Sequence, residues 1–212
     1  MFGQKPARVK IIEVGARDGF QNVQTFIPTA DKLAVIDALV AAKVGALEIS
    51  SFVSPKAIPQ LADAREVCAA VLERYGDTIE TNVLIPNLRG AQAAFEVGIR
   101  EAAYVVSVSV SHNKANINRT HEESLVELAR VQDALPAMGL KASLATSFAC
   151  PFEGWTRPED VAAMIEKVQE MGIRRVVLCD TIGVATPERV YALAQEMIAS
   201  FPQIEFSLHL HD

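Results

Sequence analysis

Aromatic residues are scarce in this 212-residue sequence, at 6% of the total. A core with so few rings must be built from Ala, Val, Ile and Leu, which is typical of α/β proteins with buried parallel strands. Half of the residues are hydrophobic, so there is ample material for a core. The length suits one domain and is short for two.

Cysteines, long apolar runs and basic clusters are also few. The three cysteines, Cys68, Cys150 and Cys179, are too widely spaced for a zinc pair or a disulfide framework, which suggests a reducing compartment. The first eight residues are polar and no apolar run approaches the thickness of a bilayer, so we expect a cytoplasmic protein without membrane attachment. The net charge is −6 and no block of Lys and Arg stands out, which argues against nucleic-acid binding.

Short apolar runs alternate with longer amphipathic ones along the whole chain. A strand-then-helix repeat with a period near 30 residues is typical of a parallel sheet with helical crossovers. The expected strands are 9–14, 46–51, 80–85, 103–109, 141–148, 175–179 and 205–211; the expected helices are 29–42, 62–74, 88–97, 122–138, 158–171 and 187–200.

The turn after the first expected strand decides between two α/β architectures. Residues 15–19 read Gly-Ala-Arg-Asp-Gly, which is not the glycine-rich fingerprint of an open dinucleotide-binding sheet. We therefore predict a (β/α)₈ TIM barrel. Such a barrel typically needs about 250 residues. We expect residues 1–212 to form a single catalytic barrel domain that is truncated after strand seven, without an eighth strand and two helices.

Two helix starts carry a T-x-x-E pattern. Thr120 with Glu123, and Thr156 with Glu159, each predict a capping box, in which two backbone N–H groups are satisfied reciprocally.

A charged pair follows the first expected strand. Arg17 and Asp18 would lie at the mouth of the barrel, where Asp18 could bind a metal ion and Arg17 could stabilise an oxyanion. A surface turn with an incidental ion pair explains the same residues equally well.

Glu48 lies inside the second expected strand, between apolar neighbours. If it faces the barrel interior, it needs a cationic partner, and Arg17 is the obvious candidate. The alternative is that Glu48 faces outward, against the end of a helix.

His209 and His211 lie two residues apart near the end of the seventh expected strand. Residues with that spacing share a face, so both imidazoles would project together and could begin a metal site. Asp180 follows the sixth expected strand, where it could orient a ligand or Arg17, or could simply cap the following loop.

Together these segments resemble the hydroxymethylglutaryl-CoA lyase family, within the acyl-CoA lyase and isopropylmalate synthase superfamily. Residues 17–21 with Lys32 resemble its R-D-G-x-Q-x10-K signature, and 209–212 resemble its H-x-H-D motif. Further matches are 50–56, 59–60, 86–90, 116–118, 150–154 and 180–183. The matches run from about residue 9 to the last residue.

The resemblance implies roles for nine residues. Asp18, His209 and His211 would bind a divalent cation, Mg²⁺ or Mn²⁺. The implied catalytic residues are Arg17 for the enolate, Glu48 to support Arg17, and Asp180; those implied to bind substrate are Gln21, Ser51 and Thr181.

The resemblance also implies a reaction. The substrate would be a small-molecule CoA thioester, 3-hydroxy-3-methylglutaryl-CoA, cleaved to acetyl-CoA and acetoacetate by a protein that could be a homodimer. A related thioester such as citramalyl-CoA, a condensing synthase, and a non-enzymatic scaffold are the alternatives. The sequence departs from the lyases at Val110, where they carry Glu, and at Ser143, where they carry Tyr. Both departures bear on the acyl group.

Overall fold

A curved parallel sheet with helices along its outer side forms the body of the protein in this computed structural model, which describes residues 9–212. The polar first eight residues lie outside the described part. The strand order is β1 (Ala46–Ser51), β2 (Glu80–Ile85), β3 (Glu101–Ser107), β4 (Gly139–Ala145), β7 (Arg175–Asp180) and β8 (Glu205–Leu210), and every neighbouring pair is parallel.

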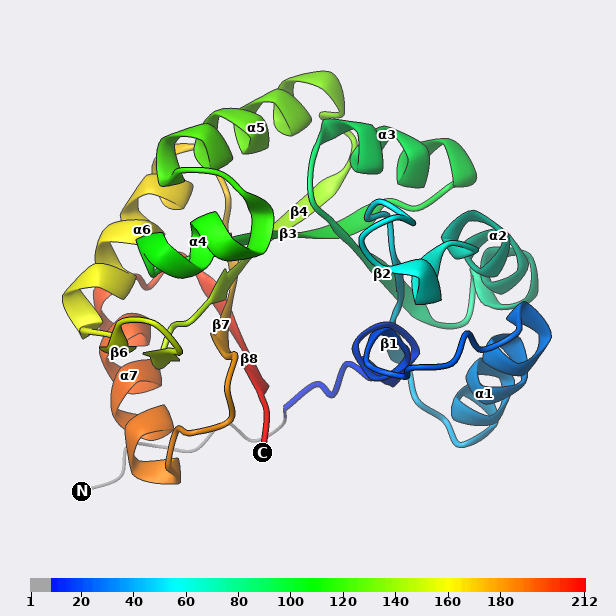
Figure 1. The fold of residues 1–212 in the computed structure, drawn as a ribbon, viewed down its shortest axis with the longest axis horizontal. Coiled ribbons are helices and arrows are strands. Elements are labelled where there is room, and N and C mark those ends of the chain that lie inside the picture. The colour runs from blue at the N-terminus through cyan, green and yellow to red at the C-terminus, as the bar shows by residue number, and fades with distance from the viewer. Residues whose placement is uncertain (1–8) are drawn as a thin grey trace.

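The crossover helices follow one another in an arc around the strands. These helices are α1 (Thr29–Ala41), α2 (Ala64–Tyr75), α3 (Leu88–Val97), α5 (His121–Ala134), α6 (Pro158–Glu170) and α7 (Pro187–Ser200). Figure 1 shows the arc open between α7 and α1. The architecture is therefore that of a (β/α) barrel, as predicted, with the sheet left open over residues 9–212.

The core lies between the sheet and this arc. Each crossover helix buries at least one apolar side chain completely; examples are Ile36, Val71, Ala94, Leu128, Ile165 and Met197. These side chains are aliphatic rather than aromatic, as the composition predicts.

The strands alternate between a helix-facing side and an inner side. Tyr104 on β3 marks the helix-facing side, because its hydroxyl donates to the Ser124 carbonyl of α5 at 2.8 Å. The residues before and after it along the strand therefore face the inside of the barrel. The carboxyl ends of all six strands lie at one edge, where functional groups of this architecture gather.

The expected strand at residues 9–14 is wrong as a full strand. Only Glu13 pairs with the sheet, through a parallel bridge to Leu47. Its N–H donates to Ala46 O at 2.9 Å, and its carbonyl accepts from Glu48 N at 2.8 Å. An apolar run forms a full ladder only where a neighbouring strand matches its register and length, and here the pairing is limited to one residue.

Several short elements were not predicted, among them the 3₁₀ turn η2 (Pro59–Leu61). A helix, α4 (Val110–Ile117), follows β3, and a two-stranded hairpin, β5 (Ala149–Cys150) with β6 (Gly154–Trp155), follows β4. The helix has little apolar periodicity and is defined by its ends. Ser109 caps its start by accepting from His112 N, and Asn118 ends it in the left-handed region at φ 54°.

The two capping-box predictions have opposite outcomes. Thr120 and Glu123 form the reciprocal box at the start of α5. At α6 the N-cap is Arg157, with a proline at the next position, and the hydroxyl of Thr156 donates instead to the Thr146 carbonyl at 2.7 Å. The second box is therefore wrong.

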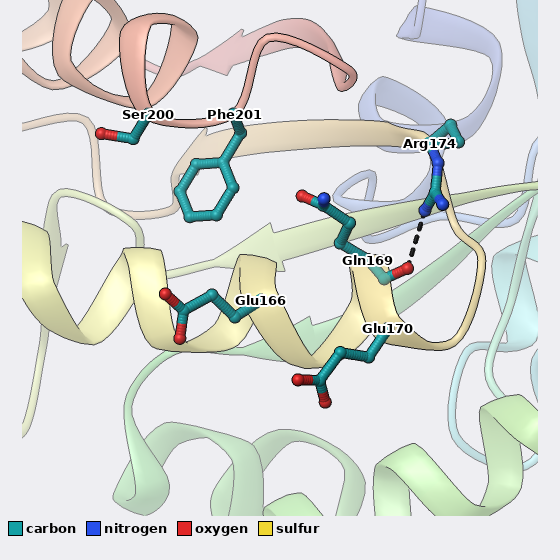
Figure 2. A pocket seen from close by; sticks show the side chains of 6 residues that line it. All are labelled: Glu166, Gln169, Glu170, Arg174, Ser200 and Phe201. Carbon is teal, nitrogen blue, oxygen red and sulfur yellow. Dashed lines mark hydrogen bonds between the residues drawn. The ribbon is translucent and has the colours of Figure 1, made fainter.

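A surface hollow lies at the opposite end of the barrel from the carboxyl edge. Figure 2 shows its lining, which comes from the C-terminal half of α6, the residue before β7 and the end of α7 with the residue after it: Glu166, Gln169, Glu170, Arg174, Ser200 and Phe201. The amino ends of the strands stabilise such barrels rather than carry their chemistry. Among residues 9–212 the structure has no helix with the length and apolar character that crossing a bilayer requires.

Candidate metal centre

The turn that carries Arg17 and Asp18 is a single turn of π-helix, η1 (Gly15–Gly19). The N–H groups of Arg17 and Asp18 both donate to the Val14 carbonyl, at 3.0 and 2.7 Å. The N–H of Gly15, the first residue of the turn, donates to the Glu13 carboxylate at 2.6 Å. Local helical distortions of this kind are frequent at functional sites.

Arg17 is buried and holds two carboxylates at once. Its Nε donates to Glu48 Oε1 at 2.5 Å, and its Nη1 donates to Asp18 Oδ1 at 2.6 Å. Glu48 therefore faces the barrel interior with Arg17 as its partner, while its neighbours Leu47 and Ile49 are buried on the opposite side of the strand. Burying these charges is tolerable only because they are paired.

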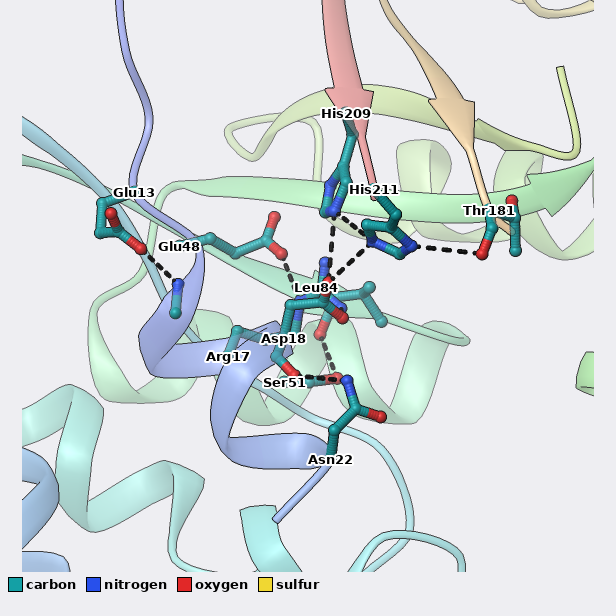
Figure 3. A network of polar contacts seen from close by, with 11 residues as sticks. Glu13, Arg17, Asp18, Asn22, Glu48, Ser51, Leu84, Thr181, His209 and His211 are labelled. Carbon is teal, nitrogen blue, oxygen red and sulfur yellow. Dashed lines mark hydrogen bonds and ion pairs between the residues drawn. The ribbon is translucent and has the colours of Figure 1, made fainter. Parts of the chain in front are cut away.

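Asp18, His209 and His211 meet at one point between the two ends of the sheet. Asp18 Oδ2 lies 3.2 Å from His209 Nε2 and 3.1 Å from His211 Nε2, and the two ring nitrogens are 2.9 Å apart. Figure 3 shows the three side chains converging from η1 and from the end of β8. The hydrogen bond with His209 holds the pKa of Asp18 well below its usual range; burial opposes this effect and the Arg17 charge adds to it.

These three donors fit a divalent cation. Ligand atoms at adjacent octahedral positions, each about 2.1 Å from one ion, lie about 3.0 Å apart. The separations of 2.9, 3.1 and 3.2 Å match that spacing. An ion held by two imidazoles and a carboxylate on one face keeps its remaining positions for oxygen ligands.

A backbone carbonyl sets the orientation of one imidazole. His211 Nδ1 lies 3.2 Å from the carbonyl oxygen of Thr181, so Nδ1 donates its proton there and Nε2 can serve as the ligand atom for a cation shared with Asp18 and His209. The carbonyl belongs to the loop after β7, which thereby supports the strand that follows it in the sheet.

The structure does not bring Asp180 into this cluster. On β7, Cys179 pairs in register with His209 on the inner side, so Asp180 points to the other side. Asp180 is 1% exposed and its Oδ2 accepts the Ala185 N–H at 2.8 Å. This contact agrees with the interpretation that Asp180 caps the following loop. Its Oδ1 is buried without a hydrogen-bond partner in the described part of the chain.

The three residues predicted to bind substrate lie around the mouth in different settings. Ser51 ends β1, is fully buried and donates to the Leu84 carbonyl at 3.2 Å. The hydroxyl of Thr181 accepts the Thr146 N–H at 2.8 Å, where Thr146 has a positive φ of 57°. Gln21 is partly exposed just after η1, and no hydrogen bond of its side chain is recorded in residues 9–212.

Lys141 is an inner-facing charge that the sequence analysis missed. It lies on β4 in register with Ala103, and burial lowers its pKa while the nearby Glu48 opposes that effect. Its signal in the sequence is the same as that of Glu48, a charge between apolar strand residues. Cys179 is a second inner-facing group, and burial together with Glu48 raises its pKa to about 12. A thiol with that pKa is not a nucleophile near neutral pH.

Two other polar residues near the mouth are engaged in local structure. The thiol of Cys150 is buried and donates to Ser109 Oγ at 2.9 Å, which agrees with a structural role. His112 Nδ1 lies 2.7 Å from Ser107 Oγ at the end of β3, and burial lowers the pKa of that imidazole.

The structure is thus a parallel (β/α) sheet of the barrel class, in which an Asp and two His converge at the carboxyl edge and could hold a metal ion. The chain belongs to the HMGL-like family, whose model matches residues 8–212. The predicted family and fold are therefore confirmed.

Relatives of known sequence or structure give the same family. The chain is 40% identical to the mitochondrial hydroxymethylglutaryl-CoA lyase of Arabidopsis thaliana over 98% of its own length, and it spans 44% of that protein. It is 35% identical to the (R)-citramalyl-CoA lyase of Chloroflexus aurantiacus, covering 96% of this chain and 68% of that one. A solved HMG-CoA lyase from Acinetobacter baumannii, in complex with coenzyme A and 3-methylmalate, superposes with a TM-score of 0.87 at 34% identity, covering 94% of this chain and 65% of that one.

Proposed function

We propose that the protein is a metal-dependent carbon–carbon lyase that cleaves 3-hydroxy-3-methylglutaryl-CoA into acetyl-CoA and acetoacetate. The observation that carries the proposal is the convergence of Asp18, His209 and His211 within hydrogen-bonding distance of one another, with Arg17 beside them. Relatives named as lyases of this substrate support the choice of reaction. We further propose a cytoplasmic location and Mg²⁺ or Mn²⁺ as the cation; a homodimer remains a prediction.

The donor set would position one end of the substrate. Asp18, His209 and His211 would hold a divalent cation which, when bound, lowers the pKa of a tertiary hydroxyl chelated together with a carboxylate. When a base takes that proton, the hydroxyl oxygen becomes the ketone of acetoacetate as the adjacent carbon–carbon bond breaks. The electron pair of that bond moves onto the thioester as an enolate, which takes up a proton to give acetyl-CoA. The chain must then stabilise a negative charge on the thioester oxygen.

Arg17 is suited to that task because it is held rigidly and is not fully used. A guanidinium has five N–H groups, and Glu48 and Asp18 occupy one each through Nε and Nη1. The remaining N–H groups can donate to the developing enolate oxygen. Glu48 fixes the plane of the guanidinium, so the donor is already oriented before the charge develops.

Exchange of Arg17 by Gln tests this role. The variant should bind Mn²⁺ like the wild type and lose on the order of 10²–10³ in turnover, since one oriented donor to the oxyanion is removed. Arg65→Gln, which breaks an exposed ion pair with Glu96, is the matched control and should keep full turnover. Wild-type turnover in a folded Arg17→Gln protein would rule the assignment out.

The acyl group is the finer part of the proposal. The Chloroflexus relative is named as a citramalyl-CoA lyase, and a lyase for that thioester, which would release pyruvate, is the second candidate. Val110, where the lyases carry Glu, is 61% exposed at the start of α4. Assaying both thioesters side by side, at equal concentrations and with Mn²⁺ present, separates the two candidates.

A condensing synthase is the remaining alternative for the same metal centre. It would join acetyl-CoA to a 2-keto acid instead of cleaving a thioester. Incubation with acetyl-CoA and a set of keto acids should release no free CoA if the protein is a lyase, and steady release of CoA would favour the synthase.

A further inference from the structure

Lys32 is among the most completely buried large side chains of the protein, at 2% exposure. Lysine is almost never buried to that extent unless it is paired. Its Nζ donates to Asp63 Oδ1 at 2.6 Å and to the Gln60 carbonyl at 2.5 Å, and it lies 4.5 Å from the centre of the Phe26 ring. The first turn of α1 is thereby tied to two loops at the carboxyl edge of the sheet.

Asp63 is itself fixed on both carboxylate oxygens. Oδ2 accepts the hydroxyl of Thr29 at 2.8 Å, while Oδ1 accepts Lys32, and the side chain is 9% exposed. Asp63 is the residue before α2, yet its side chain does not cap that helix. The carboxylate therefore binds Lys32 and Thr29 instead of capping α2.

A run of hydrogen bonds leads from this ion pair to the proposed metal ligand. Gln60, whose carbonyl Lys32 holds, donates its side-chain amide to the Val23 carbonyl at 2.9 Å. The Val23 N–H donates to Phe20 O at 3.2 Å, and Asn22 Nδ2 donates to Asp18 O at 2.9 Å. Residues 20–28, which we call the strap, connect η1 to α1 and are held along this path.

We propose that Lys32 is a positioning residue that fixes the strap against residues 60–63 and so holds the Asp18 turn in its metal-binding geometry. The expected effect on metal affinity rests on the proposed function. It assigns to Lys32 a role at a distance, since the side chain is enclosed by Asp63, Gln60 and Phe26 and contacts neither Asp18 nor the two histidines. Supporting groups of this kind affect metal affinity on the order of ten- to a hundred-fold.

Two variants separate positioning from simple stability. Lys32→Met with Asp63→Asn removes both buried charges together, so no unpaired charge remains to unfold the protein. Gln60→Ala removes only the amide that holds Val23 and keeps the carbonyl that Lys32 binds. The matched control is Arg74→Met with Asp37→Asn, which neutralises a half-exposed ion pair between α1 and α2.

Hydrogen exchange of the amides at residues 19–24 and the Kd for Mn²⁺ are then measured in each protein, alongside the Tm. Both test variants should exchange faster at 19–24 and bind Mn²⁺ about ten-fold more weakly, with a Tm close to that of the control. The control should match the wild type in hydrogen exchange and in the Kd for Mn²⁺. Unchanged exchange at 19–24 in both variants would show that Lys32 does not hold the strap in place. Faster exchange with an unchanged Kd for Mn²⁺ would show that the strap does not affect the metal centre. Absence of Mn²⁺ binding in the wild type would instead contradict the proposed function, and the exchange measurement would still decide whether Lys32 holds the strap.

Discussion

The metal centre joins the two ends of the sheet, and the two ends are built differently. On the η1 and β1 side, Arg17 and Glu48 are buried with side chains 10% and 6% exposed, and they are ion-paired. On the β8 side, His209 and His211 are 19% and 40% exposed, on a strand that pairs only with β7 among the described residues. On the first side, buried ion pairs fix the side chains without a bound ligand. The second is more exposed to solvent, and we expect it to gain more stability from a shared ligand.

Removal of the carboxylate of Glu48 should have the largest effect on stability. Glu48→Ala leaves the Arg17 guanidinium buried beside one remaining carboxylate, which typically costs about 3–5 kcal/mol. Urea unfolding followed by circular dichroism measures the change. Glu101→Ala, which breaks a partly exposed pair with Arg175, is the control and should cost less than about 1 kcal/mol. Equal losses in the two variants would show that the η1 side is not organised by its buried charges.

Mn²⁺ should stabilise the protein through the β8 side. At a concentration about 100 times its Kd, a ligand specific for the folded state adds about 2.7 kcal/mol. We expect this gain in the wild type and its absence in His209→Ala, because the carboxylate and one imidazole that remain make a weak site. Hydrogen exchange should slow more in β8 than in β1 when Mn²⁺ is added. Equal protection of the two strands would remove the distinction between the two sides.

The sequence predicts those features that follow from alternation along one element. His209 and His211 were predicted to share a face because side-chain direction repeats every second residue, and both point toward Asp18. For Glu48 the sequence left the inner and outer sides open, and the structure has it on the inner side with Arg17. The helices over 88–97 and 187–200 have the predicted bounds, since apolar periodicity and clear end signals coincide there.

Contacts between distant segments were predicted only where a buried charge or the family resemblance indicated the partner, as for Glu48 with Arg17 and for Asp18 with the two histidines. Other long-range contacts were not predicted. Lys32 and Asp63 are 31 residues apart, and nothing local to either residue indicates the other. The Thr156 box fails because the hydroxyl of Thr156 finds a partner in the loop after β4. The strand expected at 9–14 is reduced to one bridge because pairing is a property of two segments.

Loss of the Thr120 hydroxyl should cost about 1 kcal/mol, the usual value of an N-cap. Thr120→Ala removes one half of the box with Glu123 at the start of α5, on the side of the barrel opposite the opening. Thr156→Ala is the control, since its side chain does not cap a helix. The difference should appear as protection of the first-turn amides of α5 against hydrogen exchange. An unchanged first turn in Thr120→Ala would show that packing alone fixes this region.

The smallest effect is expected at the edge of the sheet. Leu178 on β7 and Leu208 on β8 are partners in register on the helix-facing side, but Leu178 is fully buried and Leu208 is 45% exposed. Leu178→Ala should cost about 2–5 kcal/mol, as a buried leucine does. Leu208→Ala should change stability by no more than about 0.5 kcal/mol, because half of its surface is already in water. Since the two residues are neighbours with the same chemistry, comparable losses would mean that the β8 face is covered in solution by a second copy of the chain, and a concentration-dependent Tm would reveal such an association.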